Sequence, residues 1–252
     1  MIFAILAAFL FAPPDATAII RKAVAVQKEQ EARNWKFTWR QDYEQIDIDK
    51  NGKVFGKKLY TSDVIMLEGS NYTKLILIDG KPLDEKMQKK VDQELEQERS
   101  NRREHSTPKK LVRSWSMSGL SDLESLFDNK LTGEETIAGR KTWRVESEPK
   151  KDHKPASKSE EQIMGTRRVT WFDQEEGFEV KHETTFVRPV EGNQPGTVYT
   201  TLYSKVGDAW LPVQEDHKVE FKALGMIHAW GEHHFRMYDY KRFEVETKIT
   251  VQ

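Results

Sequence analysis

The sequence contains no cysteine among its 252 residues. This absence excludes disulfide bonds, thiolate-bound metal ions and cysteine nucleophiles. It also leaves no cysteine that could carry the lipid of a bacterial lipoprotein. The folded chain therefore depends on packing, hydrogen bonds and ion pairs for its stability.

An excess of one charge sign is also missing. The chain has 40 basic and 41 acidic residues, and its net charge at neutral pH is −1. Domains that bind nucleic acid normally carry a clustered positive charge, so we expect no nucleic-acid partner. Hydrophobic residues make up 37% of the chain, which allows a core, and charged residues make up 32%, which indicates a very polar surface.

A hydrophobic stretch of the length that crosses a bilayer, about 20 residues, is absent as well. The apolar run at residues 2–11 instead has the length of the apolar part of a secretory signal peptide, although no lysine or arginine precedes it. We predict a signal peptide at residues 1–12, with an alternative cleavage after residue 18. The other interpretation of this run is a buried N-terminal helix. A signal peptide places the mature protein in the periplasm, as a single domain over residues 13–252.

Residues 16–33 repeat apolar side chains near the helical period and predict the first helix. Asp15 stands directly before it and suits the N-cap position. Cleavage after Ala12 retains Asp15, whereas cleavage after Ala18 removes it, so we favour the first site.

Residues 34–49 alternate between aromatic and polar side chains, which predicts a strand. Ile46 and Ile48 fall on the opposite parity from the aromatic residues, which predicts a bulge or a twist near residues 44–45. Asn51-Gly52 is typical of the turn of a hairpin. The aromatic residues expected on one face are Trp35, Phe37, Trp39 and Tyr43.

A helical insert is expected at residues 84–128. Its first helix has only a narrow apolar seam, formed by Met87, Val91 and Leu95 at intervals of four residues. A second short helix follows, where Ser121 and Glu124 form a capping-box pattern. A helix with so narrow a seam is expected to dock weakly.

The remaining segments read as strands separated by turn signals, about ten in all, and predict an antiparallel meander. Three helices are too few to cover one face of so large a sheet. We therefore predict a mainly β fold with some α structure. The curved antiparallel sheet would form an incomplete, half-open β-barrel, with the helices as a lid.

Signatures of catalysis are absent. The sequence has no nucleophile elbow, no P-loop and no glycine pattern of a dinucleotide site. A metal site at His228, His233 and His234, with Glu232 nearby, is conceivable, but we favour polar faces of exposed strands. We predict no enzyme, no cofactor and no metal.

Aromatic residues are the informative feature, with 12 phenylalanines, 7 tryptophans and 7 tyrosines. Many occupy alternating strand positions, which fits either an ordinary core or a cavity for a lipid-like ligand. We favour the cavity because few helices are available to cover the sheet. The predicted ligand-binding residues are Trp35, Phe37, Trp39, Tyr43, Leu75, Leu77, Met87, Val91, Leu95, Trp171, Phe186 and Trp230.

Five stretches resemble the LolA/LolB-like superfamily, and more closely its uncharacterised outer-membrane lipoprotein-sorting-like subgroup. They are "LILIDGKPLDEK" (75–86), "GEETIAGRKTWRVESEP" (133–149), "VTWFDQEEGFEVKHETTF" (169–186), "DAWLPVQEDHKVEF" (208–221) and "YDYKRFEVETKI" (238–249).

The resemblance implies an unclosed antiparallel barrel with a helical lid around an apolar cavity for acyl chains. The expected function is that of a periplasmic, non-enzymatic protein that carries or senses a lipid, an acylated protein or another hydrophobic ligand. The alternative is a periplasmic protein–protein interaction module or envelope-stress regulator on the same fold, with envelope proteins as partners. We expect a monomer.

Overall fold

The computed structural model describes residues 14–33, 36–104, 119–223 and 227–243. Within these ranges the chain forms one antiparallel sheet of eleven strands and four helices. The signal peptide predicted at residues 1–12 lies outside the described residues. The elements are α1 (Ala16–Ala32), β1 (Phe37–Ile48), β2 (Val54–Leu67), β3 (Ser70–Ile78), β4 (Lys81–Pro82), α2 (Glu85–Glu104), α3 (Leu120–Leu126), β5 (Phe127–Ile137), β6 (Arg140–Pro149), α4 (Lys158–Ile163), β7 (Thr166–Asp173), β8 (Glu179–Phe186), β9 (Val198–Val206), β10 (Ala209–Ala223) and β11 (Ile227–Arg242).

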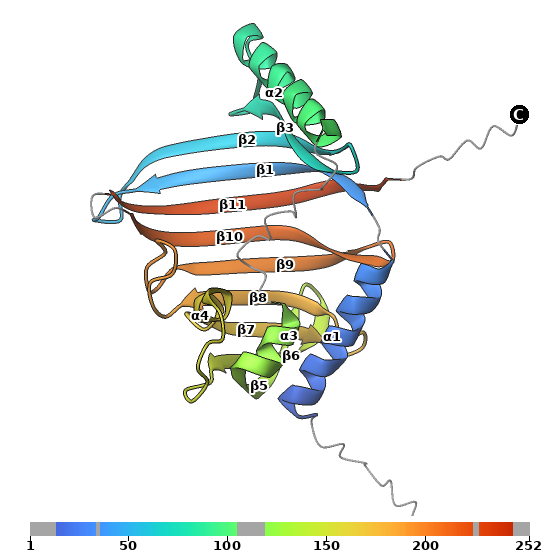
Figure 1. The fold of residues 1–252 in the computed structure, drawn as a ribbon, viewed down its shortest axis with the longest axis vertical. Helices are drawn as coiled ribbons and strands as arrows, with labels where there is room; N and C mark the ends of the chain where they lie inside the picture. The colour runs from blue at the N-terminus through green and yellow to red at the C-terminus, as the bar shows by residue number, and fades with distance from the viewer. Residues whose placement is uncertain (1–13, 34–35, 105–118, 224–226, 244–252) are drawn as a thin grey trace, which may run out of the picture.

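The sheet consists of two meanders joined side by side. Its strand order is β4-β3-β2-β1-β11-β10-β9-β8-β7-β6-β5, so the first meander joins the second through the pair of β1 and β11 (Figure 1). The edge strands β4 and β5 do not pair with each other, and the sheet stays open. The predicted fold class, a mainly β chain with a curved, unclosed antiparallel sheet, is confirmed.

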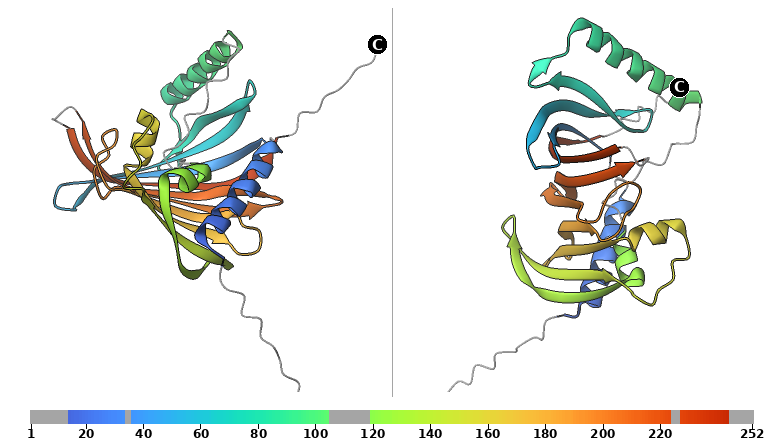
Figure 2. Two further views of the ribbon diagram at one scale, coloured as in Figure 1. Left: turned by 60° about the horizontal axis from the view of Figure 1, so that its bottom comes forward. Right: turned by 90° about the vertical axis from the view of Figure 1, so that its left-hand side faces the viewer.

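The two faces of the sheet differ in what covers them. Side chains alternate between the faces along each strand, and α1 and α3 pack on the face that carries Val145 and Phe172. We call this face the inner face and the opposite one the outer face. The sheet is twisted and bends toward the side of α1 and α3 (Figure 2).

Helix α1 begins where the sequence predicts. The Asp15 carboxylate accepts hydrogen bonds from the backbone N–H groups of Thr17, at 2.7 Å, and Ala18, at 3.0 Å. These bonds satisfy two of the amide groups that a helix start leaves without partners. Ile20 and Ala23 on its apolar stripe are fully buried.

The predicted bulge near residues 44–45 is wrong. Glu44 and Gln45 pair regularly with both β2 and β11, and the register of β1 shifts instead near its two ends. Ile46 and Ile48 simply lie on the outer face, where Ile48 stands opposite Trp230. Ile48 thus has an apolar neighbour on the outer face, and the alternation of β1 continues without a break at residues 44–45.

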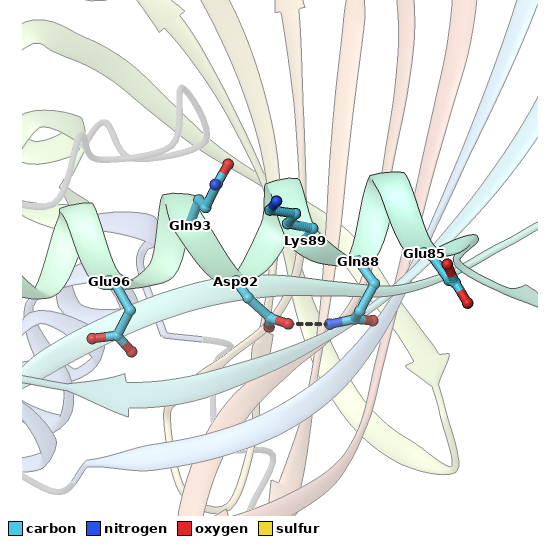
Figure 3. Close-up of a pocket in the computed structure, with 6 residues that line it drawn as sticks. All are labelled: Glu85, Gln88, Lys89, Asp92, Gln93 and Glu96. Atoms are coloured by element: carbon cyan, nitrogen blue, oxygen red, sulfur yellow. Dashed lines mark hydrogen bonds between the residues drawn. The ribbon is translucent and has the colours of Figure 1, made fainter.

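Helix α2 docks at the end of the sheet far from α1 and α3 (Figure 1). Val91 and Leu95 are buried and Met87 is half-buried, which agrees with a narrow seam. Asp92 forms an ion pair of 3.0 Å with Lys74 of β3, which the register places on the outer face. The side of α2 shown in Figure 3 is polar, and Gln88 there donates a hydrogen bond to Asp92.

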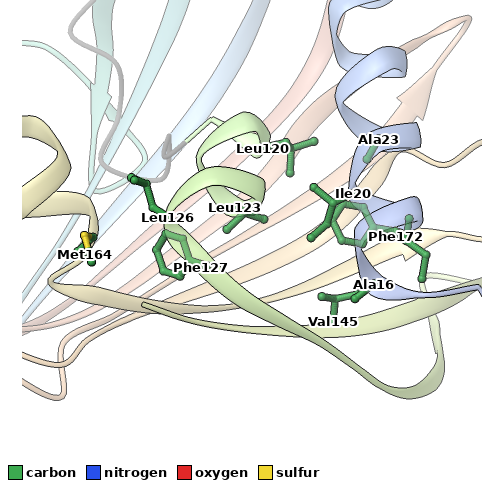
Figure 4. Close-up of a cluster of buried hydrophobic side chains, with 11 residues drawn as sticks. Ala16, Ile20, Ala23, Leu120, Leu123, Leu126, Phe127, Val145, Met164 and Phe172 are labelled. Carbon is green, nitrogen blue, oxygen red and sulfur yellow. The ribbon is translucent and has the colours of Figure 1, made fainter. Parts of the chain in front are cut away.

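The largest apolar cluster joins α1 and α3 to the inner face of β5, β6 and β7 (Figure 4). Ile20, Leu123 and Phe172 are among its fully buried side chains. The capping box predicted at Ser121 does not form, because Gly119 is the N-cap residue of α3 and no side chain caps the helix. Helices α1 and α3 thus cover one end of the inner face, as a lid would.

Candidate ligand-binding site

A row of side chains crosses the inner face at right angles to the strands. Each residue stands directly opposite the next on the neighbouring strand, from β6 to β2. The row changes character in the middle, with polar residues on β7 to β10 and aromatic residues on β11, β1 and β2. In order it is Val145, Thr170, His182, Thr201, Glu215, Phe235, Tyr43 and Tyr60.

The aromatic half of this row is stacked. The ring centroids of Tyr43 and Phe235 lie 4.7 Å apart, and those of Tyr43 and Tyr60 lie 5.7 Å apart. All three rings are half-buried. Offset stacks of this kind are favourable beyond the area that they bury, and they leave apolar ring surface on the inner face.

A second line of rings continues from Phe235 across the next strands. His217 lies 5.5 Å from Phe235 and 4.2 Å from Tyr199, and Tyr199 lies 5.3 Å from Phe186. Tyr199 and Phe186 are buried with Val190 in a small apolar cluster. Ring contacts therefore connect β2 to β8 along the inner face without a gap.

A hollow of about 510 Å³ opens beside these rings. It combines apolar walls from several strands with polar groups that come from strand ends and from the loop before β9. Its lining residues are Gln45, Asp47, Glu191, Asn193, Tyr199, His217, Val219, Phe221, Ala229, Trp230, Gly231, His233 and Phe235. Apolar walls with a few fixed polar groups are typical of sites for small ligands.

The histidines of the hollow favour their neutral form. Burial, with a further contribution from the nearby His233, lowers the pKa of His217 to about 4. Burial also lowers the pKa of His233, whose Nδ1 lies 2.6 Å from the Tyr43 hydroxyl group. At neutral pH the hollow thus presents uncharged imidazoles beside aromatic rings.

A buried ion pair lies next to His182 in the polar half of the row. The carboxylate of Glu179 accepts hydrogen bonds from the Arg168 guanidinium and the Nδ1 atom of His182. Burial acts to raise the pKa of Glu179, but the neighbouring Arg168 and His182 outweigh it and lower the pKa to about 2. Burial lowers the pKa of His182. This arrangement is an Arg–Glu ion pair beside a neutral imidazole.

The predicted ligand-binding residues fall into three groups. The register and ring contacts place Phe37, Trp39, Tyr43, Leu75 and Phe186 on the inner face. Helix α2 carries Met87, Val91 and Leu95. The outer face carries Leu77 and Trp171, and Trp35 lies outside the described residues. Trp230 also stands on the outer face by register, opposite Ile48, but it contributes to the lining of the hollow.

Trp171 shows why parity matters. It is buried on the outer face, between the Arg144 guanidinium at 5.7 Å and the Lys181 ammonium at 4.3 Å, and its indole N–H donates to Glu135. Its neighbour Phe172 takes the inner face. Adjacent aromatic residues in one strand must separate in this way, and the sequence does not say which of them faces the ligand.

Sequence analysis missed the polar residues of the site, Thr170, His182, Thr201, Glu215 and His217. Their positions in the alternating pattern of each strand could have identified them. Each shares a strand face with apolar or aromatic residues, as His182 does with Val180 and Phe186 in "FEVKHETTF". A polar residue at an inward position of an apolar face indicates either a structural bond or a ligand.

A larger hollow, of about 650 Å³, lies along α2 (Figure 3). Its described lining residues all come from this one helix, so they supply no opposing wall, and all are charged or amide side chains. They are Glu85, Gln88, Lys89, Asp92, Gln93 and Glu96. We regard it as the solvated side of an amphipathic helix.

The histidines considered for a metal are separated. His233 and His234 lie on opposite faces, and Nδ1 of His234 lies 2.7 Å from Asp216. Among the described residues, no group of three His, Cys, Asp or Glu side chains could hold a metal ion. Within the same ranges, no helix has the length and hydropathy needed to cross a membrane.

Comparison with known proteins gives structural matches alone. No family model matches the chain, and no curated protein matches it. Among solved structures, a LolA superfamily protein from Nitrosomonas europaea is 12% identical with a TM-score of 0.39, covering 95% of this chain and 99% of its own. A DUF1329 family protein from Desulfovibrio piger is 13% identical with a TM-score of 0.38, covering 95% and 96%.

A domain of a putative outer membrane lipoprotein-sorting protein from Vibrio parahaemolyticus is 12% identical with a TM-score of 0.38, covering 92% of this chain and 95% of its own. The chain is thus similar in structure to LolA superfamily and lipoprotein-sorting proteins, as the sequence resemblance predicts.

Proposed function

We propose that the protein is a non-enzymatic binding protein for an amphipathic, lipid-like ligand or an acylated protein. The ligand lies on the inner face, with its apolar part against the rings of Phe235, Tyr43 and Tyr60. The observation that carries this proposal is the stacked, half-buried aromatic row beside a hollow of about 510 Å³. A volume of this order suits a ligand of roughly drug size.

The position of the aromatic rings on the sheet supports ligand binding at this surface rather than a role in the packed core. Helices α1 and α3 cover the inner face over β5, β6 and β7. The aromatic rings on β11, β1 and β2 stay half-buried in the same structure. Apolar surface that stays accessible on a folded protein indicates a place where something else binds.

We further propose that the protein carries or senses this ligand in the periplasm after export. The apolar run at residues 2–11 supports export. The residues of the inner face that we expect to contact the ligand further include Phe37, Trp39, Tyr43, Leu75 and Phe186.

Phe235→Ala is expected to weaken binding of a dansyl-labelled undecanoic acid by about tenfold to a hundredfold, because it removes the central ring of the row. A fluorescence titration of the purified protein measures this. The matched control is Tyr238→Ala, which removes an exposed ring from the outer face of the same strand and should leave binding unchanged. A wild-type protein without saturable binding would overturn the proposed function.

A further inference from the structure

The hollow of about 510 Å³ on the inner face carries negative charge. Its described lining residues include two carboxylates, Asp47 of β1 and Glu191 of the loop between β8 and β9, and no lysine or arginine. Its two histidines, His217 and His233, are neutral at neutral pH because burial lowers the pKa of each. Lys58 of β2 lies on the same face but outside this lining. The hollow therefore has the charge that attracts a cation.

Asp47 occupies a position that the neighbouring strands leave free for it. It stands between two glycines on the inner face, Gly56 of β2 and Gly231 of β11. A Cβ atom at Gly56 would lie 2.6 Å from Oδ2 of Asp47, so a larger residue there would displace the carboxylate. Oδ1 accepts a hydrogen bond of 2.8 Å from the amide of Gln45, which is uncharged. The half-buried carboxylate is thus fixed in place while its charge remains available to a ligand.

Glu191 comes to the hollow from a loop that is fixed to the sheet. The backbone N–H of Lys222 in β10 donates a hydrogen bond of 2.8 Å to the Gly192 carbonyl group. Gly192 packs so closely on the Phe221 ring that a side chain at this position would collide with it. The Glu191 carboxylate accepts a hydrogen bond from the side chain of Gln162, again an uncharged donor. The second carboxylate therefore has a defined position as well.

Aromatic rings complete the walls of the hollow. Tyr199, Phe221 and Phe235 belong to its lining. The face of an aromatic ring is electrically negative and attracts a cation that lies over it. Two carboxylates and three rings beside neutral imidazoles thus favour a positively charged group over an anion or a neutral group.

The hollow lies within reach of the stacked rings. Asp47 is four residues beyond Tyr43 on the inner face of β1, which is about 13 Å along a strand. Phe235 lines the hollow and also stacks on Tyr43, at a centroid distance of 4.7 Å. A ligand with its charged group near Asp47 can therefore lay its chain over Phe235 and Tyr43.

We infer that the hollow binds the positively charged ammonium group of an amphipathic ligand. Asp47 and Glu191 supply the opposite charge, and the ring of Phe235 contacts the carbon atoms attached to the nitrogen. The chain of the ligand lies over Tyr43 and Tyr60. This inference rests on the proposed function and names the ligand class for the same site.

Three amphiphiles with chains of equal length test the preference for charge. Dodecyltrimethylammonium, 1-monolauroylglycerol and dodecyl sulfate are each used to displace the dansyl-labelled undecanoic acid from the wild-type protein, below the concentrations at which they form micelles. The ammonium compound is expected to bind about tenfold more tightly than either of the others, since a cation held against rings and carboxylates gains about that factor. Added salt should reduce this preference, because it screens accessible charges.

Asp47→Asn removes one of the two charges at nearly constant shape and keeps an acceptor for Gln45. It is expected to weaken binding of dodecyltrimethylammonium about tenfold and to leave binding of 1-monolauroylglycerol unchanged. Glu191→Gln is a second variant with the same expectation, and it decides the test if Asp47→Asn does not fold. The matched control is Glu44→Gln, which removes the same charge from the outer face of β1 and should alter neither affinity.

The outcomes separate the two proposals. If the probe does not bind, or none of the three amphiphiles displaces it, the proposed function fails. If the three bind equally, or the variants of Asp47 and Glu191 bind the ammonium compound as the wild-type protein does, the inference fails while the proposed function stands. Equal weakening of all three ligands in a folded Asp47→Asn protein would also overturn the inference, because the effect would then not depend on charge.

Discussion

Glu179→Gln is expected to destabilise the protein by about 3–5 kcal/mol at neutral pH, because it removes the acidic partner of a buried ion pair. The side chain of Arg168 is 2% exposed and that of Glu179 is 8% exposed, so water cannot replace the lost partner. The remaining amide can still accept a hydrogen bond but carries no charge. Urea unfolding followed by circular dichroism measures the loss.

The pH dependence of the same pair gives an independent check. The pKa of Glu179 is about 2 in the folded protein, against a reference value of 4.5. A carboxyl group with a lowered pKa stabilises the fold above its unfolded value, and this contribution is lost as the pH falls from about 4.5 through 2. The wild-type protein is therefore expected to lose stability across this window, and Glu179→Gln to lack this part of the loss.

A double variant tests whether charge is the cause. Arg168→Met combined with Glu179→Gln removes both charges and keeps an acceptor for His182. It is expected to recover most of the stability lost in the single variant, because replacing both partners of a buried pair is far less costly than removing one. Equal stability of the single and double variants would contradict this explanation.

The sequence predicts the parts of the fold that local physics determines. Asp15 as an N-cap, the Asn51-Gly52 turn and the seam at Val91 and Leu95 follow from short-range rules, and the structure has all of them. In the Asn51-Gly52 turn, Gly52 has a φ of +82°, a conformation that glycine adopts readily. Alternation along residues 37–48 likewise gives the two faces of β1.

The site depends on long-range pairing, which is why the sequence predicts less of it. The neighbour of β1 in the middle of the sheet is β11, almost two hundred residues away, so Tyr43 and Phe235 meet only once the two meanders join. The polar half of the row likewise needs the registers of β7, β8 and β9 together. Strand parity identifies two sets of residues, and only the packing of α1 and α3 decides which set faces inward.

His217→Phe is expected to make the protein more resistant to acid. The His217 side chain is 17% exposed, stacks on Tyr199 and lies near Phe235, and its Nε2 atom has no hydrogen-bond partner among the described residues. The nearest carboxylate oxygen, of Glu215, is 3.8 Å away, which is too far for a hydrogen bond. A phenyl ring keeps the stack and removes the group that takes up a proton.

The sign follows from where the proton binds. Burial lowers the pKa of His217 to about 4 in the folded protein, below its reference value of 6.5. Above pH 6.5 the ring is neutral in both states and contributes nothing to pH dependence. As the pH falls from 6.5 to 4 the unfolded chain binds the proton first, so the wild-type protein loses about 3 kcal/mol over this window.

Free energies of unfolding in urea at pH 8, 6, 5 and 4 measure the effect. The difference between His217→Phe and the wild-type protein should grow in favour of the variant toward pH 4, whereas the two should stay nearly parallel above pH 7. Parallel profiles for His217→Phe and wild type over the whole range would mean that the imidazole is solvated in the folded state, and that the hollow holds water around a histidine rather than a dry face of rings.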